Sequence, residues 1–235
     1  MINRDVTDFV HLHLHSAYGS LQDAVAKPIG YCEKAANIGQ GALGVTEHGS
    51  CASHFAFHQA GEATDTKIIY GNEFYFAADR TLRGLTDEEK NGLTATEVRD
   101  ANKARLRKAH LLLLAETDEG LHNIYRLNYH ANNSGFYGKA TIDLPLLRQY
   151  SEGIIATTTC VISPMARMLQ NKKIDDMSVW FEDMLGIFGK DRFFIELHPH
   201  ALDIQREYNQ VLIEVFRKKY DVKCLVQNDV HYVEQ

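Results

Sequence analysis

The chain alternates between short apolar runs and longer segments with apolar residues at helical spacing. Alternating or continuous apolar runs of four to eight residues predict strands, whereas apolar residues recurring about every 3.6 positions predict helices. Strands that alternate with helices are typical of βαβ units and a parallel sheet. Seven runs predict strands, at residues 8–15, 41–48, 67–76, 110–116, 153–160, 192–200 and 222–231.

Helical signals lie between these runs. Pro28 fits the first turn of a helix and Gly39 lies just after its end, as these residues do at helix termini. No linker rich in Pro, Gly or Ser divides the chain, so we predict one α/β domain over residues 1–235, with a barrel-like closure of its strands. Helices are predicted at residues 28–37, 163–169, 175–188 and 202–219.

One polar segment, residues 79–109, interrupts this pattern between the third and fourth predicted strands. Its second half, RDANKARLRK (99–108), predicts a helix that carries several basic residues. Such a helix face is either simply solvated or a patch that faces a phosphate backbone, and the sequence leaves both alternatives open. The basic residues are Arg99, Lys103, Arg105, Arg107 and Lys108.

Composition narrows the class of protein. With 25 Lys and Arg against 31 Asp and Glu, the net charge is −6, which argues against a protein that coats duplex DNA and leaves a local basic groove open. No apolar run is long enough to span a membrane, so we expect no membrane partner. Four scattered cysteines without a CxxC pair indicate a reducing cytoplasm. Twelve histidines are the one compositional hint of chemistry.

Residues that bind transition metals stand at the ends of most predicted strands. In FVHLHLHS (9–16), histidines alternate with apolar residues, so the imidazoles share one face of a strand. The carboxyl ends of strands carry the chemistry in α/β barrels. More than four ligands imply more than one metal, and mixed imidazole, carboxylate and thiolate suit zinc, manganese or iron. The strand-end residues are His13, His15, His48, Glu73, Cys160, Asp229 and His231.

Several motifs, in this order and spacing, resemble one family. The chain is similar to the PHP (polymerase and histidinol phosphatase) domain, in the form found at the N-terminus of bacterial DNA polymerase III alpha subunits. The resemblance covers nearly the whole chain. The motifs are FVHLHLHSAY (9–18), NIGQGALGVTEHG (37–49), YGNEFYFA (70–77), HLLLLAETDEGLHNIYRL (110–127), SGFYGKATID (134–143), YSEGIIATTTC (150–160), FIELHPH (194–200) and NDVHY (228–232).

The resemblance implies a distorted seven-stranded (β/α)7 barrel, similar to a TIM barrel, with two or three divalent metals held through nine ligands. It adds His110, which begins a predicted strand and is therefore not placed by the strand-end argument. At the ninth position the family usually has Asp where this chain has Gln22, and Asp23 follows one residue later. Either the loop shifts to bring in Asp23, or one metal is weakly held. The implied ligands are His13, His15, His48, Glu73, His110, Cys160, Asp229 and His231.

Other residues are implied to contact the substrate. Lys139 is retained in a motif whose neighbours depart from the family pattern, and His200 matches a family position. Arg105, Arg107 and Lys108 would supply a cationic approach for DNA. We interpret Glu196 as a residue that supports a ligand, and His198 as incidental.

The resemblance implies a metal-dependent phosphoesterase, most simply a 3′–5′ exonuclease that proofreads during DNA replication in the cytoplasm. The implied partners are DNA, as a single strand or 3′ end, and polymerase or other replication subunits. Two alternatives remain open from the sequence. One is a small-molecule phosphatase similar to histidinol phosphatase, and the other is a non-catalytic, metal-bound structural module of a split polymerase.

Overall fold

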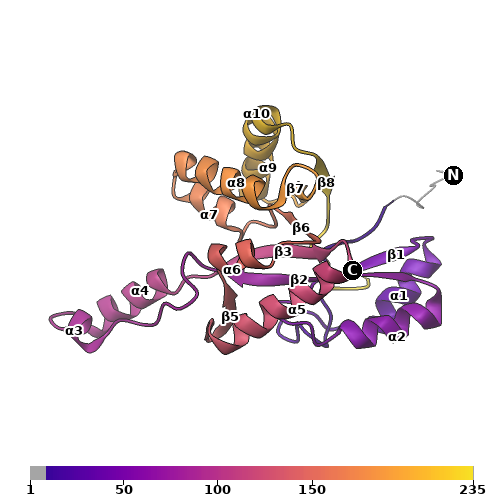
Figure 1. The fold of residues 1–235 in the computed structure, drawn as a ribbon, viewed down its shortest axis with the longest axis horizontal. Helices are drawn as coiled ribbons and strands as arrows, with labels where there is room; N and C mark the ends of the chain where they lie inside the picture. Colours follow the sequence, from indigo (N-terminus) through magenta and orange to yellow (C-terminus); the bar gives the residue numbers. More distant parts are fainter. Residues whose placement is uncertain (1–8, 235) are drawn as a thin grey trace.

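A curled, mixed β-sheet forms the centre of the computed structural model, which describes residues 9–234 (Figure 1). The strand order is β4-β5-β2-β3-β6-β7-β8, and β1 also pairs with β2. Helices cover the outside of the sheet, so the architecture is α/β as predicted. The strands are β1 (Ala42–Val45), β2 (Lys67–Phe76), β3 (Ala109–Ala115), β4 (Phe136–Tyr137), β5 (Lys139–Ile142), β6 (Ile154–Thr157), β7 (Phe193–Leu197) and β8 (Cys224–Val226).

The sheet is not fully parallel, so that part of the prediction is wrong. β2 is parallel to β1 and β5, and β6, β7 and β8 are parallel to one another. β3, however, is antiparallel to both β2 and β6. The connection from β2 to β3 returns to the edge that it left, because Phe76 at the end of β2 pairs with Ala109 at the start of β3. β3 therefore begins where its neighbours end.

The N-terminal histidine-rich run lies between β1 and the chain that follows β8. Of the predicted strand 8–15, residue 8 lies outside the described residues, and the rest makes isolated bridges instead of a regular strand. His11 bridges Leu43 in β1, and Leu14 bridges Val230 after β8. The Gly44 amide donates to the His11 carbonyl at 2.6 Å, and the His15 amide donates to the Val230 carbonyl at 2.8 Å. This segment therefore links β1 to the chain after β8.

The predicted helices are confirmed within a few residues. Pro28 begins α1 as expected, and the Ser163 side chain caps α7 by accepting from the Ala166 amide. The predicted segment 202–219 is one continuous helical stretch that includes a π-helical part, η1. The helices around the sheet are α1 (Pro28–Asn37), α2 (His54–Thr64), α5 (Asp118–Asn133), α6 (Leu144–Gln149), α7 (Pro164–Gln170), α8 (Ile174–Phe188), α9 (Asp203–Val211), η1 (Leu212–Arg217) and α10 (Lys218–Tyr220).

The short hairpin of β4 and β5 was not predicted as strand. β4 has two residues, and Gly138 makes the turn with φ of 72°, a conformation that suits glycine because it has no Cβ. A run this short gives no alternation to recognise. The hairpin nevertheless matters, because β5 pairs with the end of β2 and so carries Lys139 next to Tyr75.

Two clusters of buried apolar side chains hold the sheet between its helices. The larger cluster packs β2, β3, β6 and β7 against α5, α7, α8, α9 and η1, with Phe74, Leu111 and Phe181 fully buried. The smaller cluster packs Leu14 and Val45 against α1 and α2. Burial of apolar area is the main stabilising contribution in such a core, so the position of β2 is set from both sides.

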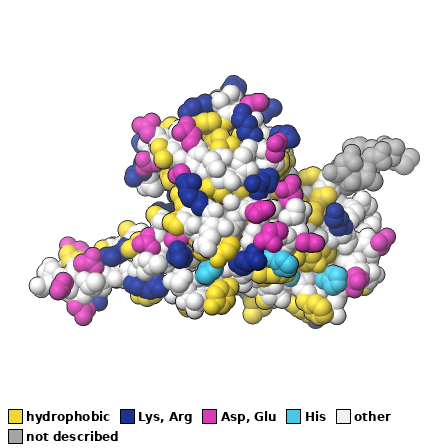
Figure 2. All heavy atoms as spheres, viewed as in Figure 1, with side chains coloured by type: hydrophobic (Ala, Val, Ile, Leu, Met, Phe, Trp, Pro, Cys, Tyr) yellow, Lys and Arg dark blue, Asp and Glu magenta, His cyan; other side chains and the backbone are white. Residues whose placement is uncertain are grey.

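The chain between β2 and β3 forms an arm that projects from the sheet (Figure 1). It contains α3 (Asp87–Lys90) and α4 (Ala95–Arg105), and each begins with a capping box, from Thr86 and Thr94. Neither helix buries a residue, so local capping and ion pairs define the arm. Its basic side chains are interspersed with acidic ones on the face seen in Figure 2.

Helix α5 approaches Gly153, the residue before β6, too closely for any side chain at Gly120. A Cβ there would lie 1.7 Å from the Gly153 carbonyl oxygen, which itself accepts a hydrogen bond from the Glu116 amide at 2.9 Å. We expect Gly120→Ala to lower the free energy of unfolding by about 1–3 kcal/mol, the usual cost of overpacking. Urea denaturation followed by circular dichroism measures this change.

Gly186 in α8 provides the matched control, since a Cβ at that position would meet no atom within 4 Å. Gly186→Ala is expected to stabilise the protein by about 0.5–1 kcal/mol through helix propensity. Equal effects of the two substitutions would show that the contact between α5 and Gly153 does not constrain the fold.

Candidate metal centre

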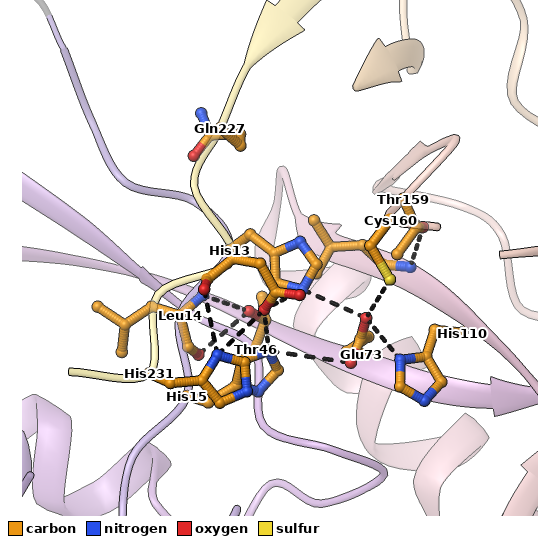
Figure 3. A network of polar contacts seen from close by, with 12 residues as sticks. His13, Leu14, His15, Thr46, Glu73, His110, Thr159, Cys160, Gln227 and His231 are labelled. Atoms are coloured by element: carbon orange, nitrogen blue, oxygen red, sulfur yellow. Dashed lines mark hydrogen bonds and ion pairs between the residues drawn. The ribbon is translucent and has the colours of Figure 1, made fainter. Parts of the chain in front are cut away.

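The side chains predicted as metal ligands converge at one edge of the sheet (Figure 3). They come from segments far apart in the sequence: the N-terminal histidine-rich run, the chain after β1, β2 itself, the start of β3, the chain after β6 and the chain after β8. His110 joins them because β3 is antiparallel and begins at this edge. The converging residues are His13, His15, His48, Glu73, His110, Cys160, Asp229 and His231.

Glu73 lies at the middle of the cluster and is fully buried. Its Oε1 lies 3.2 Å from His13 Nε2 and 3.0 Å from His110 Nδ1. Its Oε2 lies 2.5 Å from His48 Nδ1, and the Cys160 thiol reaches Oε1 at 3.8 Å. Burial alone raises the pKa of Glu73, but His110 and His13 outweigh this effect and hold the pKa well below its usual range. Glu73 is therefore an ionised carboxylate shared by several ligands.

Asp229 is a second shared carboxylate. Its Oδ1 lies 3.1 Å from His15 Nε2, and 3.4 Å from both His13 Nε2 and His231 Nδ1. Burial raises its pKa, but His13 and the hydrogen bond from His15 outweigh burial, so the pKa is lowered. The His15 ring stacks on that of His48 with centroids 4.0 Å apart. The imidazoles are thus packed side by side around two carboxylates.

Groups of three ligand atoms lie close enough together for one ion each. Four such groups occur among the described residues, each with its atoms within 4.8 Å of one another. Some residues belong to two groups, as expected where neighbouring ions share ligands. The groups are His15, His48 and His231; His13, His15 and Asp229; His13, Glu196 and His198; and His48, Glu73 and His110.

Several buried polar atoms of the cluster have no hydrogen-bond partner among the described residues. Leaving such atoms unpaired costs free energy, so each needs another kind of partner. Imidazole nitrogen, carboxylate oxygen and thiolate sulfur are ligands of zinc, manganese and iron, so the residues present fit such ions. The unpaired atoms are Nε2 of His13, Nε2 of His15, Nδ1 of His48, Oε2 of Glu73 and Oδ1 of Asp229.

Asp23, not Gln22, faces the cluster at the ninth position. Asp23 Oδ2 lies 3.3 Å from His48 Nε2 and 3.7 Å from His231 Nε2. The Gln22 amide instead faces Lys139, whose Nζ lies 3.5 Å from Gln22 Oε1. Of the two alternatives that the sequence leaves open, the geometry favours a shifted loop in which Asp23 takes the position of the usual ligand.

Glu196 orients His13 from behind. Glu196 Oε1 lies 2.8 Å from His13 Nδ1, and Thr157 donates a hydrogen bond to Oε2. Burial raises the pKa of Glu196, but His13 and His198 lower it to about 2. With a proton on Nδ1 directed at Glu196, His13 presents Nε2 to Glu73 and Asp229, the arrangement that fixes metal-binding histidines.

The interpretation of His198 as incidental is wrong. His198 is buried, and its Nε2 lies 2.8 Å from the same Glu196 oxygen that contacts His13. A signal was present in the sequence, because positions two apart on a strand share a face and Glu196 and His198 are separated by two. His198 thus belongs to the network that holds His13.

Electrostatics favour a charged His13 in the absence of other cations. Burial lowers the pKa of this imidazole, but the carboxylates of Asp229, Glu196 and Glu73 outweigh burial and raise it well above its usual value. The Cys160 thiol is affected in the opposite sense, since burial and then Glu73 raise its pKa. Binding of metal ions to such groups releases their protons, so metal affinity should rise with pH.

The residues predicted to contact the substrate lie in different places, and only some of them are near the cluster. Lys139 lies beside the cluster, with Nζ 2.9 Å from the Tyr75 hydroxyl. His200 is exposed, with its ring centroid 5.3 Å from that of His198. Arg105 lies on the arm and forms an ion pair with Glu89 at 2.6 Å. The structure therefore brings Lys139 to the site and leaves Arg105 neutralised away from it.

Arg107 and Lys108 lie at the base of the arm, directly before β3 and two residues or fewer from Ala109. The pKa of Lys108 is lowered by burial and then by Arg83. Burial and then Arg107 lower the pKa of Arg167 to about 10. We call these four residues, Arg83, Arg107, Lys108 and Arg167, the arm-base cluster. It gathers positive charge next to the strand that carries His110.

Comparisons with known proteins show the family to which the chain belongs. Residues 11–200 match the PHP domain, so the chain belongs to the PHP domain family. It is 34% identical over 96% of its length to a DNA polymerase III subunit alpha of Aquifex aeolicus, and 33% identical over 97% to that of Thermus aquaticus. The chain spans 18% and 17% of the length of these relatives. The resemblance noted from the sequence is thereby confirmed.

Solved structures share the fold at low sequence identity. A putative metal-dependent phosphoesterase from Bifidobacterium adolescentis has a TM-score of 0.50, is 12% identical, and is matched over 96% of this chain and 88% of its own. An amidohydrolase from Chromobacterium violaceum has a TM-score of 0.52, also at 12% identity, over 94% and 87% of the two chains. None of the described helices has the length and apolar character needed to cross a bilayer.

Removal of the Glu196 charge tests how far His13 depends on it. We expect Glu196→Gln to weaken metal binding about 10–100-fold, as is typical when the partner of a ligating histidine is lost. Competition titration with a chelating dye, with zinc and with manganese, measures this affinity. Glu207→Gln, an exposed glutamate on α9, is the matched control and should leave affinity unchanged. Wild-type affinity in Glu196→Gln would contradict the assigned role.

Proposed function

We propose that this PHP domain is a metal-dependent phosphoesterase that removes nucleotides from the 3′ end of DNA. The observation that carries the proposal is the buried cluster in which unpaired imidazole and carboxylate atoms from four parts of the chain converge. The names of the relatives, DNA polymerase III subunit alpha, support DNA as the substrate. Replication partners and a cytoplasmic location would follow from such a role.

The proposed cofactors are two or three divalent ions of zinc, manganese or iron. Their proposed ligands are His13, His15, Asp23, His48, Glu73, His110, Cys160, Asp229 and His231. When bound, such ions generate hydroxide near neutral pH and neutralise phosphoryl oxygens. The fold proposed to hold them is a distorted (β/α)7 barrel, supported by the curled sheet that the segment around His11–Leu14 closes.

Protein side chains around the cluster have separate roles in this proposal. Glu196 orients His13, and Glu73 and Asp229 keep the imidazoles at fixed separations. Lys139, held by the Tyr75 hydroxyl, is positioned to contact a phosphoryl oxygen of the substrate. His200 stands exposed next to His198 and is a second candidate for that contact.

DNA needs a cationic approach, because the protein carries a net charge of −6. We propose the arm-base cluster for this purpose, with Arg107 and Lys108 as members predicted from the sequence. Burial and then Arg83 lower the pKa of Lys108, and burial and then Arg107 lower the pKa of Arg167. Positive charges this near to one another would gain from a phosphate between them. The ion pair of Arg105 with Glu89 removes Arg105 from the proposal.

The two alternatives are tested together with the proposal. His13→Ala and Asp229→Asn should each reduce cleavage of labelled single-stranded DNA at least about a hundredfold, because the metals supply several kcal/mol of transition-state stabilisation. His122→Ala, an exposed histidine on α5, should retain full activity. Cleavage with manganese or zinc is followed on gels with the label at either end, which reports polarity.

A phosphomonoester is assayed in parallel with the same proteins. Hydrolysis of the monoester alone would indicate a small-molecule phosphatase. Metal binding without hydrolysis of either substrate would indicate a structural module, and both results would overturn the proposed nuclease.

Removing two charges of the arm-base cluster tests whether the cluster attracts DNA. We expect the double variant Arg107→Ala, Lys108→Ala to bind single-stranded DNA more weakly and with a shallower dependence on salt, because each lost phosphate contact removes its counterion release. Fluorescence anisotropy over a range of salt concentrations measures the slope. Arg105→Ala is the matched control, since its charge is already paired, and it should bind as the wild type does. If the wild type, the double variant and Arg105→Ala all showed the same salt dependence of binding, the arm-base cluster would not be a DNA-binding surface.

A further inference from the structure

A groove of about 730 Å³ opens beside the metal centre, and His48 belongs to both. The groove lies between the loop after β1, the end of β2, helix α5 and the β4–β5 hairpin, which packs next to α5 (Figure 1). Its volume is that of a site for a small organic molecule, many times larger than a phosphate alone needs. A molecule with its phosphate at His48 therefore has room for a further chemical group here.

Tyr75 forms a rigid wall of the groove. Gly49 packs directly on its ring, since a Cβ at Gly49 would lie 3.0 Å from Tyr75 Cδ2. The Lys139 ammonium lies 4.6 Å from the ring centroid and 2.9 Å from the hydroxyl. Among the described residues no carboxylate lies within 4.0 Å of Lys139, and its other contact is the neutral Gln22 amide. The groove thus offers one uncompensated positive charge at its metal-side wall.

The outer part of the groove combines an exposed aromatic ring with amide groups. Phe136 is 55% exposed in β4, although most phenyl groups in this protein are buried. Asn128 and Asn132 lie one turn apart on α5, and Asn132 Nδ2 donates to the Asn128 carbonyl at 2.8 Å. Gly138 at the hairpin turn has no side chain, and a Cβ there would meet no atom within 4 Å, so the mouth stays open.

We propose that this groove binds the terminal nucleoside of a strand whose phosphodiester lies at the metal centre. The proposal rests on the proposed function and adds residues that determine its specificity. Phe136 stacks on the base, an interaction that every base permits because each has a π-face. Asn128 and Asn132 offer both donors and acceptors to the base edge or the sugar. Lys139 contacts the phosphate from the side of Tyr75.

Two chromogenic diesters with the same leaving group measure how much the nucleoside contributes to turnover. The p-nitrophenyl ester of thymidine 5′-monophosphate carries it, and methyl p-nitrophenyl phosphate does not. Phe136→Ala should lower kcat/KM about tenfold or more on the thymidine ester and leave the methyl ester unchanged. Phe136→Trp should retain activity on both, since it keeps a stacking surface. Tyr129→Ala, an exposed aromatic on α5 outside the groove, is the matched control.

Binding of thymidine 5′-monophosphate to the metal-loaded protein, followed by calorimetry, gives a readout that does not require hydrolysis. We expect Phe136→Ala to weaken this binding about tenfold while binding of methyl phosphate stays the same. If the wild type hydrolyses no diester, the proposed function fails, yet loss of nucleotide binding in Phe136→Ala would still support the groove. Unchanged nucleotide binding, or equal losses with both ligands, would overturn the groove assignment whatever the activity.

Discussion

The positions of the clustered histidines depend on one buried group, the carboxylate of Glu73. It lies in the middle of β2, the strand that pairs with β1, β3 and β5, so its position is determined by the most constrained part of the sheet. Histidines from three other segments lie within 3.2 Å of its two oxygens. A buried carboxylate is costly unless it is paired, and here the imidazoles and the proposed metals compensate for that cost.

Closure of the sheet provides the second constraint. Residues 11–14 bridge β1 on one side and the chain after β8 on the other, so His13 and His15 lie next to Asp229 and His231. Leu14, between the two histidines, packs in the smaller apolar cluster. One short segment therefore connects β1 with the chain after β8 and contributes two of the clustered histidines, so the closure of the sheet and the arrangement of the cluster depend on the same residues.

Two kinds of residue surround the cluster: those that hold its side chains in place and those on its solvent side. Glu196 with His198 supports His13 from behind, and the Ser20 hydroxyl links the loop before Asp23 to Glu47 at 2.7 Å. On the solvent side, the groove with Phe136 and Lys139 borders His48, whereas the arm-base cluster lies beside the strand of His110. In the proposed function, a strand of DNA meets aromatic, amide and cationic groups before its phosphate reaches the proposed metals.

The sequence by itself determined the α/β class, the approximate bounds of several helices and the residue types of the candidate site. Local signals carry these features: proline and glycine at helix ends, and apolar alternation that places His13 and His15 on one face. The resemblance to the family added His110, and the sequence left open which of Gln22 and Asp23 faces the site.

Only the tertiary structure decided the direction of β3, the positions of His198 and Asp23 beside the cluster, and the pairing of Arg105 with Glu89. The direction of β3 depends on where the arm between β2 and β3 returns to the sheet. The position of the loop that carries Gln22 and Asp23 depends on the contact between Ser20 and Glu47. These are contacts between residues distant in the chain. Local periodicity carries no information about them, because it reports only which face of its own element a residue occupies.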